Sequence, residues 1–104
     1  MRKIDIAKAV DKTRGQALKT YGSRNSRKIA EESLTFCEEW AIINCDDLDH
    51  MDRKSAKRSC KEFVKKKIEE EKVGSIFLSI LISIVVKLIV EWIINRFIYN
   101  LNLK

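Results

Sequence analysis

The side chains best suited to metal chemistry are three cysteines and the single histidine. Thiolates and an imidazole form the ligand set of many structural zinc sites, where closely spaced cysteines hold one side of the metal. Here Cys37, Cys45, Cys60 and His50 are widely spread, and no two cysteines have that spacing. We therefore expect no zinc site. Cys37 and Cys60 are expected to face each other as buried apolar residues, with a disulfide between them as the alternative.

Four aspartates in one short stretch raise the question of a calcium site. Asp46, Asp47, Asp49 and Asp52 lie close together. A calcium loop of the EF-hand type also needs a central glycine and a distant bidentate glutamate, and this stretch has neither. We interpret it as a turn whose carboxylates accept hydrogen bonds from the free N–H groups at the start of a helix.

A catalytic centre is not indicated by the remaining polar residues. No serine, cysteine or lysine has a general base beside it in the sequence pattern, and the three glycines form no phosphate-binding loop. We expect a protein that is not an enzyme and that binds no metal or cofactor.

The basic residues indicate an anionic partner. The chain carries 21 Lys and Arg against 15 Asp and Glu, a net charge of +6, and the net charge changes from +5 over residues 1–24 to −5 over residues 25–50 and +4 over residues 51–73. Such an excess favours phospholipid or nucleic acid as a partner. The residues expected to contact it are Lys54, Lys57, Arg58, Lys61 and Lys65. The alternative is a solvated surface with no partner.

Small or polar residues recur at every fourth position near the C-terminal end of the sequence, and large apolar residues surround them. The series is Ser75, Ser79, Ser83, Lys87, Glu91 and Asn95. Residues four apart lie above one another on a helix, so the series forms a polar ridge that favours close contact between copies of the helix. We expect a homo-oligomer, and a pore lined by Lys87 and Glu91 is its most specific form.

The apolar helix also raises the question of a membrane span. Lys87 and Glu91 each cost about 2.5–3.5 kcal/mol at the centre of a bilayer, so a single spanning helix is marginal unless the two charges pair. Lysines before the segment favour a cytoplasmic N-terminal part. The alternatives are burial inside a large assembly and an interfacial helix. No signal peptide is expected, because no apolar segment follows Met1.

The elements that carry these residues are predicted to be helices throughout. The chain has no proline, and Lys, Glu, Ile and Leu are abundant, which favours an all-α fold. We predict helices over about residues 3–21, 25–44, 50–72 and 75–100. The second and third should form a hairpin in a domain of residues 1–73, and residues 74–104 should form a long apolar helix. The expected hairpin core is Leu34, Cys37, Trp40, Ala41, Ala56, Cys60 and Phe63.

In layout the chain is short, charged at one end and apolar at the other. It resembles small phage membrane proteins of the holin or DNA-ejection kind, and the resemblance covers layout alone. The expected function is that of a non-enzymatic oligomeric structural protein, in a membrane or within a virion. The alternatives are a soluble adaptor that docks its last helix on another structural protein, and a basic nucleic-acid-binding module.

Overall fold

The chain folds into four helices. The computed structural model describes residues 2–71 and 76–102, without the side chains of residues 76–79 and 99–102. The helices are α1 (Lys3–Thr20), α2 (Arg24–Ile43), α3 (Arg53–Glu71) and α4 (Ile76–Asn102), and the described residues contain no strand. The predicted all-α class is confirmed. The predicted domain boundary between residues 73 and 74 lies outside the described residues.

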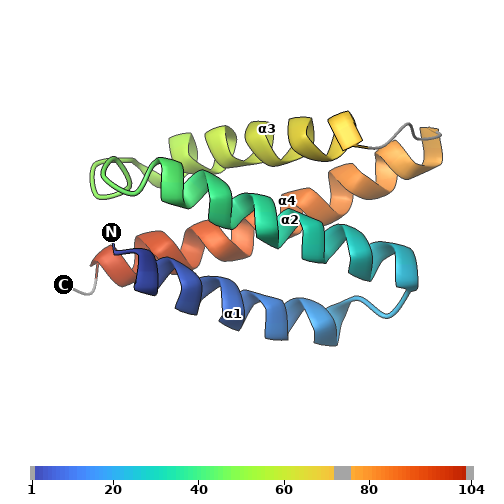
Figure 1. Cartoon of the computed structure of the whole chain (residues 1–104), viewed down its shortest axis with the longest axis horizontal. Coiled ribbons are helices and arrows are strands. Elements are labelled where there is room, and N and C mark those ends of the chain that lie inside the picture. Colours follow the sequence, from blue (N-terminus) through green and yellow to red (C-terminus); the bar gives the residue numbers. More distant parts are fainter. Residues whose placement is uncertain (1, 72–75, 103–104) are drawn as a thin grey trace.

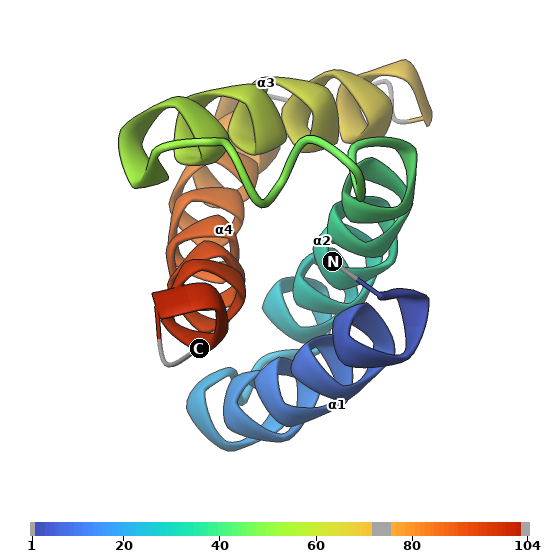
Figure 2. The same cartoon turned by 90° about the vertical axis from the view of Figure 1, so that its left-hand side faces the viewer.

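Successive helices run in opposite directions along the long axis of the molecule (Figure 1). Seen from one end, the four helices occupy the corners of a bundle, with α2 and α4 facing each other across it (Figure 2). Each helix packs against the next, α4 also packs against α1, and α2 and α4 touch across the centre. Within the described residues α1 and α3 make no such contact. The centre of the bundle is therefore the contact between α2 and α4.

The core draws on all four helices. The buried face of α4 is the largest contribution, and it comprises Ile82, Val85, Val86, Ile89, Val90, Ile93, Ile94, Phe97 and Ile98. These side chains pack with residues of α1, α2 and α3 in one hydrophobic cluster. The prediction of a long apolar C-terminal helix set apart for assembly is not supported, because α4 buries its inner face inside the bundle and exposes a mixed outer face that includes Lys87 and Glu91.

The residues predicted for the hairpin core lie between α2 and α3 or beside that contact. Leu34, Cys37, Trp40, Ala41, Ala56 and Cys60 are buried, whereas Phe63 is half-buried beneath the ammonium group of Lys67. The indole N–H of Trp40 donates a hydrogen bond of 3.0 Å to the hydroxyl of Ser59 on α3. This bond satisfies the polar atom of a buried aromatic ring and fixes its orientation.

Two helix starts depend on capping side chains. Helix α2 begins at Arg24, one residue earlier than predicted, and the hydroxyl of Ser23 accepts a hydrogen bond from the backbone N–H of Ser26. Helix α3 begins at Arg53, three residues later than predicted, with Asp52 at its cap. In both cases the cap immediately precedes the helix and accepts from the N–H three residues on.

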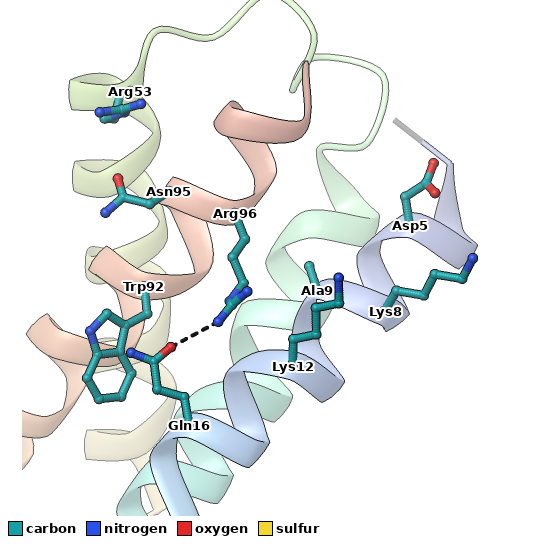
Figure 3. Close-up of a pocket in the computed structure, with 9 residues that line it drawn as sticks. All are labelled: Asp5, Lys8, Ala9, Lys12, Gln16, Arg53, Trp92, Asn95 and Arg96. Carbon is teal, nitrogen blue, oxygen red and sulfur yellow. Dashed lines mark hydrogen bonds between the residues drawn. The ribbon is translucent and has the colours of Figure 1, made fainter. Parts of the chain in front are cut away.

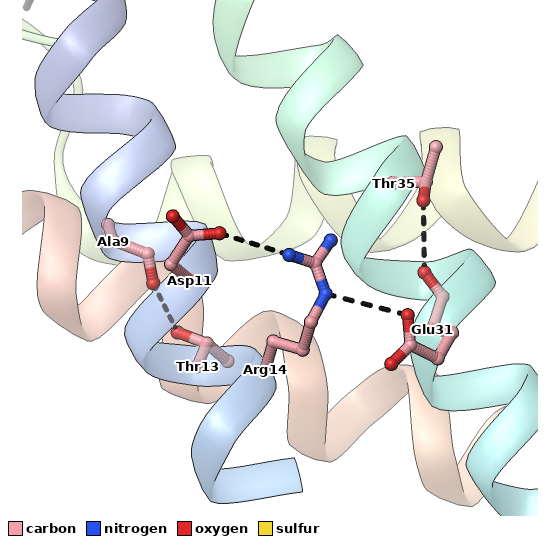
Figure 4. A network of polar contacts seen from close by, with 6 residues as sticks. All are labelled: Ala9, Asp11, Thr13, Arg14, Glu31 and Thr35. Atoms are coloured by element: carbon pink, nitrogen blue, oxygen red, sulfur yellow. Dashed lines mark hydrogen bonds and ion pairs between the residues drawn. The ribbon is translucent and has the colours of Figure 1, made fainter. Parts of the chain in front are cut away.

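Arg14 links the first two helices (Figure 4). Its guanidinium lies 3.0 Å from the carboxylate of Asp11 on α1 and 3.5 Å from that of Glu31 on α2. The Arg14 side chain lies at the edge of the α1–α2 contact, where it reaches both carboxylates. The neighbouring Thr13 is buried, and its hydroxyl donates a hydrogen bond to the carbonyl of Ala9.

The described part of α4 carries three charges, Lys87, Glu91 and Arg96. No helix in the described residues is sufficiently long and apolar to traverse a bilayer. The predicted transmembrane helix is therefore not supported.

Candidate anion-binding surfaces beside helix α4

The polar ridge predicted for self-association divides between several environments. Ser75 lies outside the described residues, and the side chain of Ser79 is not described. Ser83 is half-buried and Lys87 is exposed. Glu91 and Asn95 are both half-buried, and each borders a different hollow, one against α3 and the other against α1. The C-terminal part of the ridge, Glu91 and Asn95, therefore faces other helices of the same chain.

A row of aliphatic side chains occupies the outer face of α4 instead. Ile80, Ile84 and Leu88 are 55%, 53% and 36% exposed. They are four residues apart and so lie above one another on one face of the helix. We call these three residues the apolar row. This row could not be predicted from the sequence, because a helix that is apolar on most sides does not reveal which of its apolar residues will remain exposed.

A hollow of about 320 Å³ lies between α3 and α4, beside the outer face of α4. Its lining is dominated by cations and consists of Lys54, Lys57, Arg58, Lys61, Glu62, Lys87, Val90 and Glu91. Five basic and two acidic side chains give it a net charge of +3. We call it the basic groove. Four of the five residues predicted to contact an anionic partner line it, and the fifth, Lys65, is half-buried one turn further along α3.

One ion pair within the groove links α3 to α4. The Nζ of Lys57 is 3.4 Å from Oε1 of Glu91, and both side chains are partly exposed. Because the two helices run in opposite directions, Lys61, one turn after Lys57, lies level with Lys87, one turn before Glu91 (Figure 1). The apolar row begins at this level and continues towards the C-terminal end of α3.

A larger hollow of about 650 Å³ lies on the other side of α4, against α1. It is lined mainly by Lys8, Lys12, Arg53 and Arg96, with Trp92 and Asn95 contributed by α4 (Figure 3). Together the two hollows gather nine basic and three acidic side chains, a net charge of +6 that equals the net charge of the whole chain. Nine of the 21 Lys and Arg residues thus lie on α4 or border it.

The cysteines form no candidate metal centre in the described part of the chain. Cys37 and Cys60 are buried with their Sγ atoms 3.6 Å apart, and both are free thiols. Cys45 is half-buried at the end of α2. Within the described residues, no group of three or more His, Cys, Asp or Glu side chains is arranged to hold a metal ion. Burial raises the pKa of the Cys60 thiol well above its ordinary value, and the neighbouring Cys37 adds to the effect.

No known family model, curated protein or solved structure matches this chain.

Proposed function

We propose that the protein is a non-enzymatic docking protein that attaches to an anionic phospholipid surface through its α3–α4 face. One observation carries the proposal: α4 holds both the apolar row and one wall of the basic groove, and Leu88 of the row follows Lys87 of the groove directly in the chain. Aliphatic side chains that enter the boundary between headgroups and acyl chains, flanked by lysines that contact anionic headgroups, are how peripheral helices bind bilayers from one side.

The magnitudes indicate that both features are needed. A Lys or Arg near an anionic membrane contributes about 1 kcal/mol, so a groove of net charge +3 contributes about 3 kcal/mol. Complete burial of an Ile or Leu side chain contributes about 1.5–3 kcal/mol, so three half-exposed ones contribute about 3 kcal/mol. Neither sum alone gives better than millimolar binding, whereas about 6 kcal/mol corresponds to a dissociation constant of tens of micromolar.

Binding to nucleic acid would account for the basic groove but not for the apolar row. A phosphate backbone is bound by cations and by backbone N–H groups, and its affinity depends steeply on salt. It offers no apolar surface to Ile80, Ile84 and Leu88, and these side chains would remain in water. A bilayer surface accounts for the cations and the aliphatic row together.

Self-association through α4 is the second candidate, because the same apolar row can cover a copy of itself. A symmetric contact on this face would bring two basic grooves, each of net charge +3, close to one another. This repulsion weakens the contact, whereas an anionic surface relieves it.

Vesicle co-sedimentation tests the proposal. The protein is expected to sediment with vesicles that contain phosphatidylglycerol and not with vesicles of phosphatidylcholine alone. Ile80→Ser with Ile84→Ser should reduce binding at least tenfold, and so should Lys54→Glu with Lys61→Glu. The matched controls are Ile43→Ser, at an isoleucine that is 65% exposed at the end of α2, and Lys19→Glu with Lys28→Glu, at exposed lysines of α1 and α2.

Three results would overturn the proposal. The first is unchanged vesicle binding by the serine variant, since the apolar row would then play no part. The second is tighter binding to a DNA duplex than to the anionic vesicles, lost in the glutamate variant only. The third is a dimer in sedimentation equilibrium without lipid that the serine variant converts to a monomer.

A further inference from the structure

The hollow between α1 and α4 differs from the basic groove in shape and lining. It is about twice as large, and it includes an indole ring and two side-chain amides as well as cations. Lys8 and Lys12 are one turn apart on α1, and Arg96 reaches from α4 towards α1 (Figure 3). Arg53, at the start of α3, completes its basic lining. We call this hollow the α1–α4 pocket.

Its electrostatics favour a compact anion. Four cations line the pocket against one carboxylate, that of Asp5, and an ion pair of 3.1 Å with Arg2 partly neutralises this carboxylate. The guanidinium of Arg96 donates a hydrogen bond of 3.0 Å to Oε1 of Gln16, which orients it between the two helices. Donors held in this way bind phosphate oxygens with little loss of side-chain entropy.

The rest of the lining favours a planar group that carries N–H donors. The ring of Trp92 borders the pocket and lies tilted against the ring of Tyr21, with ring centroids 6.3 Å apart. Oδ1 of Asn95 is buried and accepts no hydrogen bond from the described residues. A buried acceptor without a donor is unfavourable, and a rotation of the Asn95 side chain towards the pocket would let a ligand N–H group remove that cost. An aromatic ring beside an amide is a common way to hold a nucleobase.

We propose that the α1–α4 pocket binds a nucleoside phosphate. Its phosphates would contact Lys8, Lys12 and Arg96, and its base would lie against Trp92 with an exocyclic N–H donated to Asn95. The pocket lies across α4 from the basic groove and shares no lining residue with it. A failure of nucleotide binding would therefore not contradict membrane docking, and a failure of membrane docking would not contradict nucleotide binding.

Tryptophan fluorescence gives a direct measurement of binding. The chain has two tryptophans, and Trp40 is 2% exposed and hydrogen-bonded inside the bundle, so a ligand in the pocket should quench Trp92. Titrations with ADP, pyrophosphate and adenosine measure the contributions of the phosphates and of the base to affinity separately. We expect saturable quenching by ADP, with an affinity at least tenfold higher than that of pyrophosphate or adenosine.

Variants locate the site by calorimetric titration with ADP. Lys12→Gln changes an exposed side chain and should lower ADP affinity at least fivefold without loss of helix content, whereas Lys19→Gln, on the same helix outside the pocket, should not. Asn95→Leu should reduce the preference for ADP over pyrophosphate. Equal affinity for ADP and pyrophosphate would overturn the proposal. A single-stranded oligonucleotide that binds more tightly than ADP and displaces it would also overturn it. The same holds if Lys12→Gln leaves the affinity for ADP unchanged.

Discussion

The ammonium group of Lys57 on α3 lies 3.4 Å from the carboxylate of Glu91 on α4. The two residues are 34 positions apart in the chain, and their pairing makes Glu91 part of a contact within one molecule. It also lowers the positive charge of the basic groove at its centre. We therefore expect the pair to affect binding to an anionic surface more than it affects folding stability.

Glu91→Gln is expected to strengthen attachment to anionic vesicles. The substitution raises the net charge of the groove from +3 to +4, while a partly exposed ion pair contributes less than about 1 kcal/mol to folding. Vesicle co-sedimentation should show tighter binding, and urea unfolding should show little change. Glu38→Gln on α2, diagonally across the bundle from α4, serves as the control and should change neither (Figure 2). Weaker binding by Glu91→Gln would contradict the proposed docking face.

Ile89→Ala should destabilise the whole molecule. Ile89 is fully buried on the inner face of α4, and truncation of a buried isoleucine to alanine costs about 2–5 kcal/mol. Leu88→Ala, at the adjacent and 36% exposed position, should cost less than about 1 kcal/mol. Urea unfolding followed by circular dichroism gives both values. A separate early transition for α4, with the remaining helices unaffected by Ile89→Ala, would show that the helix does not share the core.

Cys45 should react with a thiol reagent well before the other two cysteines. Burial raises the pKa of Cys60, which keeps its thiol protonated, and Cys37 is equally inaccessible beside it. Labelling by an aromatic disulfide reagent should show one fast thiol in the native protein and three in denaturant. Cys45→Ser should abolish the fast phase. Two or three fast thiols in the native protein would be inconsistent with the packing of α2 against α3.

Asp52→Asn should make the stability of the protein less dependent on acid pH. The backbone N–H and the hydroxyl of Ser55 donate to the Asp52 carboxylate at 2.8 and 2.9 Å, and these bonds lower its pKa. A carboxylate whose pKa is lower in the folded state stabilises the protein above its ordinary pKa, and this contribution is lost as the pH falls through the folded value. The native chain should thus exceed the variant in stability at neutral pH.

Thermal unfolding of both proteins from neutral to strongly acid pH measures this difference. The gap in melting temperature should narrow below the ordinary pKa of an aspartate and close at the lowest pH. Asp47→Asn, at an exposed aspartate of the preceding turn, provides the comparison. A gap that stays constant with pH would show that the charge of Asp52 plays no part.

The helices could be predicted from the sequence because their determinants are local. The absence of proline and the helix-favouring composition are sufficient for an all-α fold. The start of α2 was predicted one residue too late. Several polar residues near Ser23 have similar capping chemistry, and only the backbone conformation at the helix start selects one of them. The basic residues of α3 could also be predicted to form one surface, since they recur on one side of a single helix.

The outer face of α4 could not be predicted, because it is determined by contacts distant in sequence. A helix with apolar residues on nearly every side has no single stripe that marks its buried face. Glu91 looked like a residue for contact between copies, and its partner Lys57 lies on another helix of the same chain. Likewise, nothing in the order of residues brings Lys8 and Lys12 near Arg96, since the proximity of α1 to α4 arises from closure of the bundle.

The contact of α2 with α4 at the centre of the bundle has a consequence during protein synthesis. The apolar faces of α1, α2 and α3 are synthesised before residues 82–98, which complete their core. Until then the nascent chain exposes an aliphatic channel that fits its own last helix. Folding of this protein must therefore wait for α4, and an apolar helix from any other source can compete for that channel in the interval.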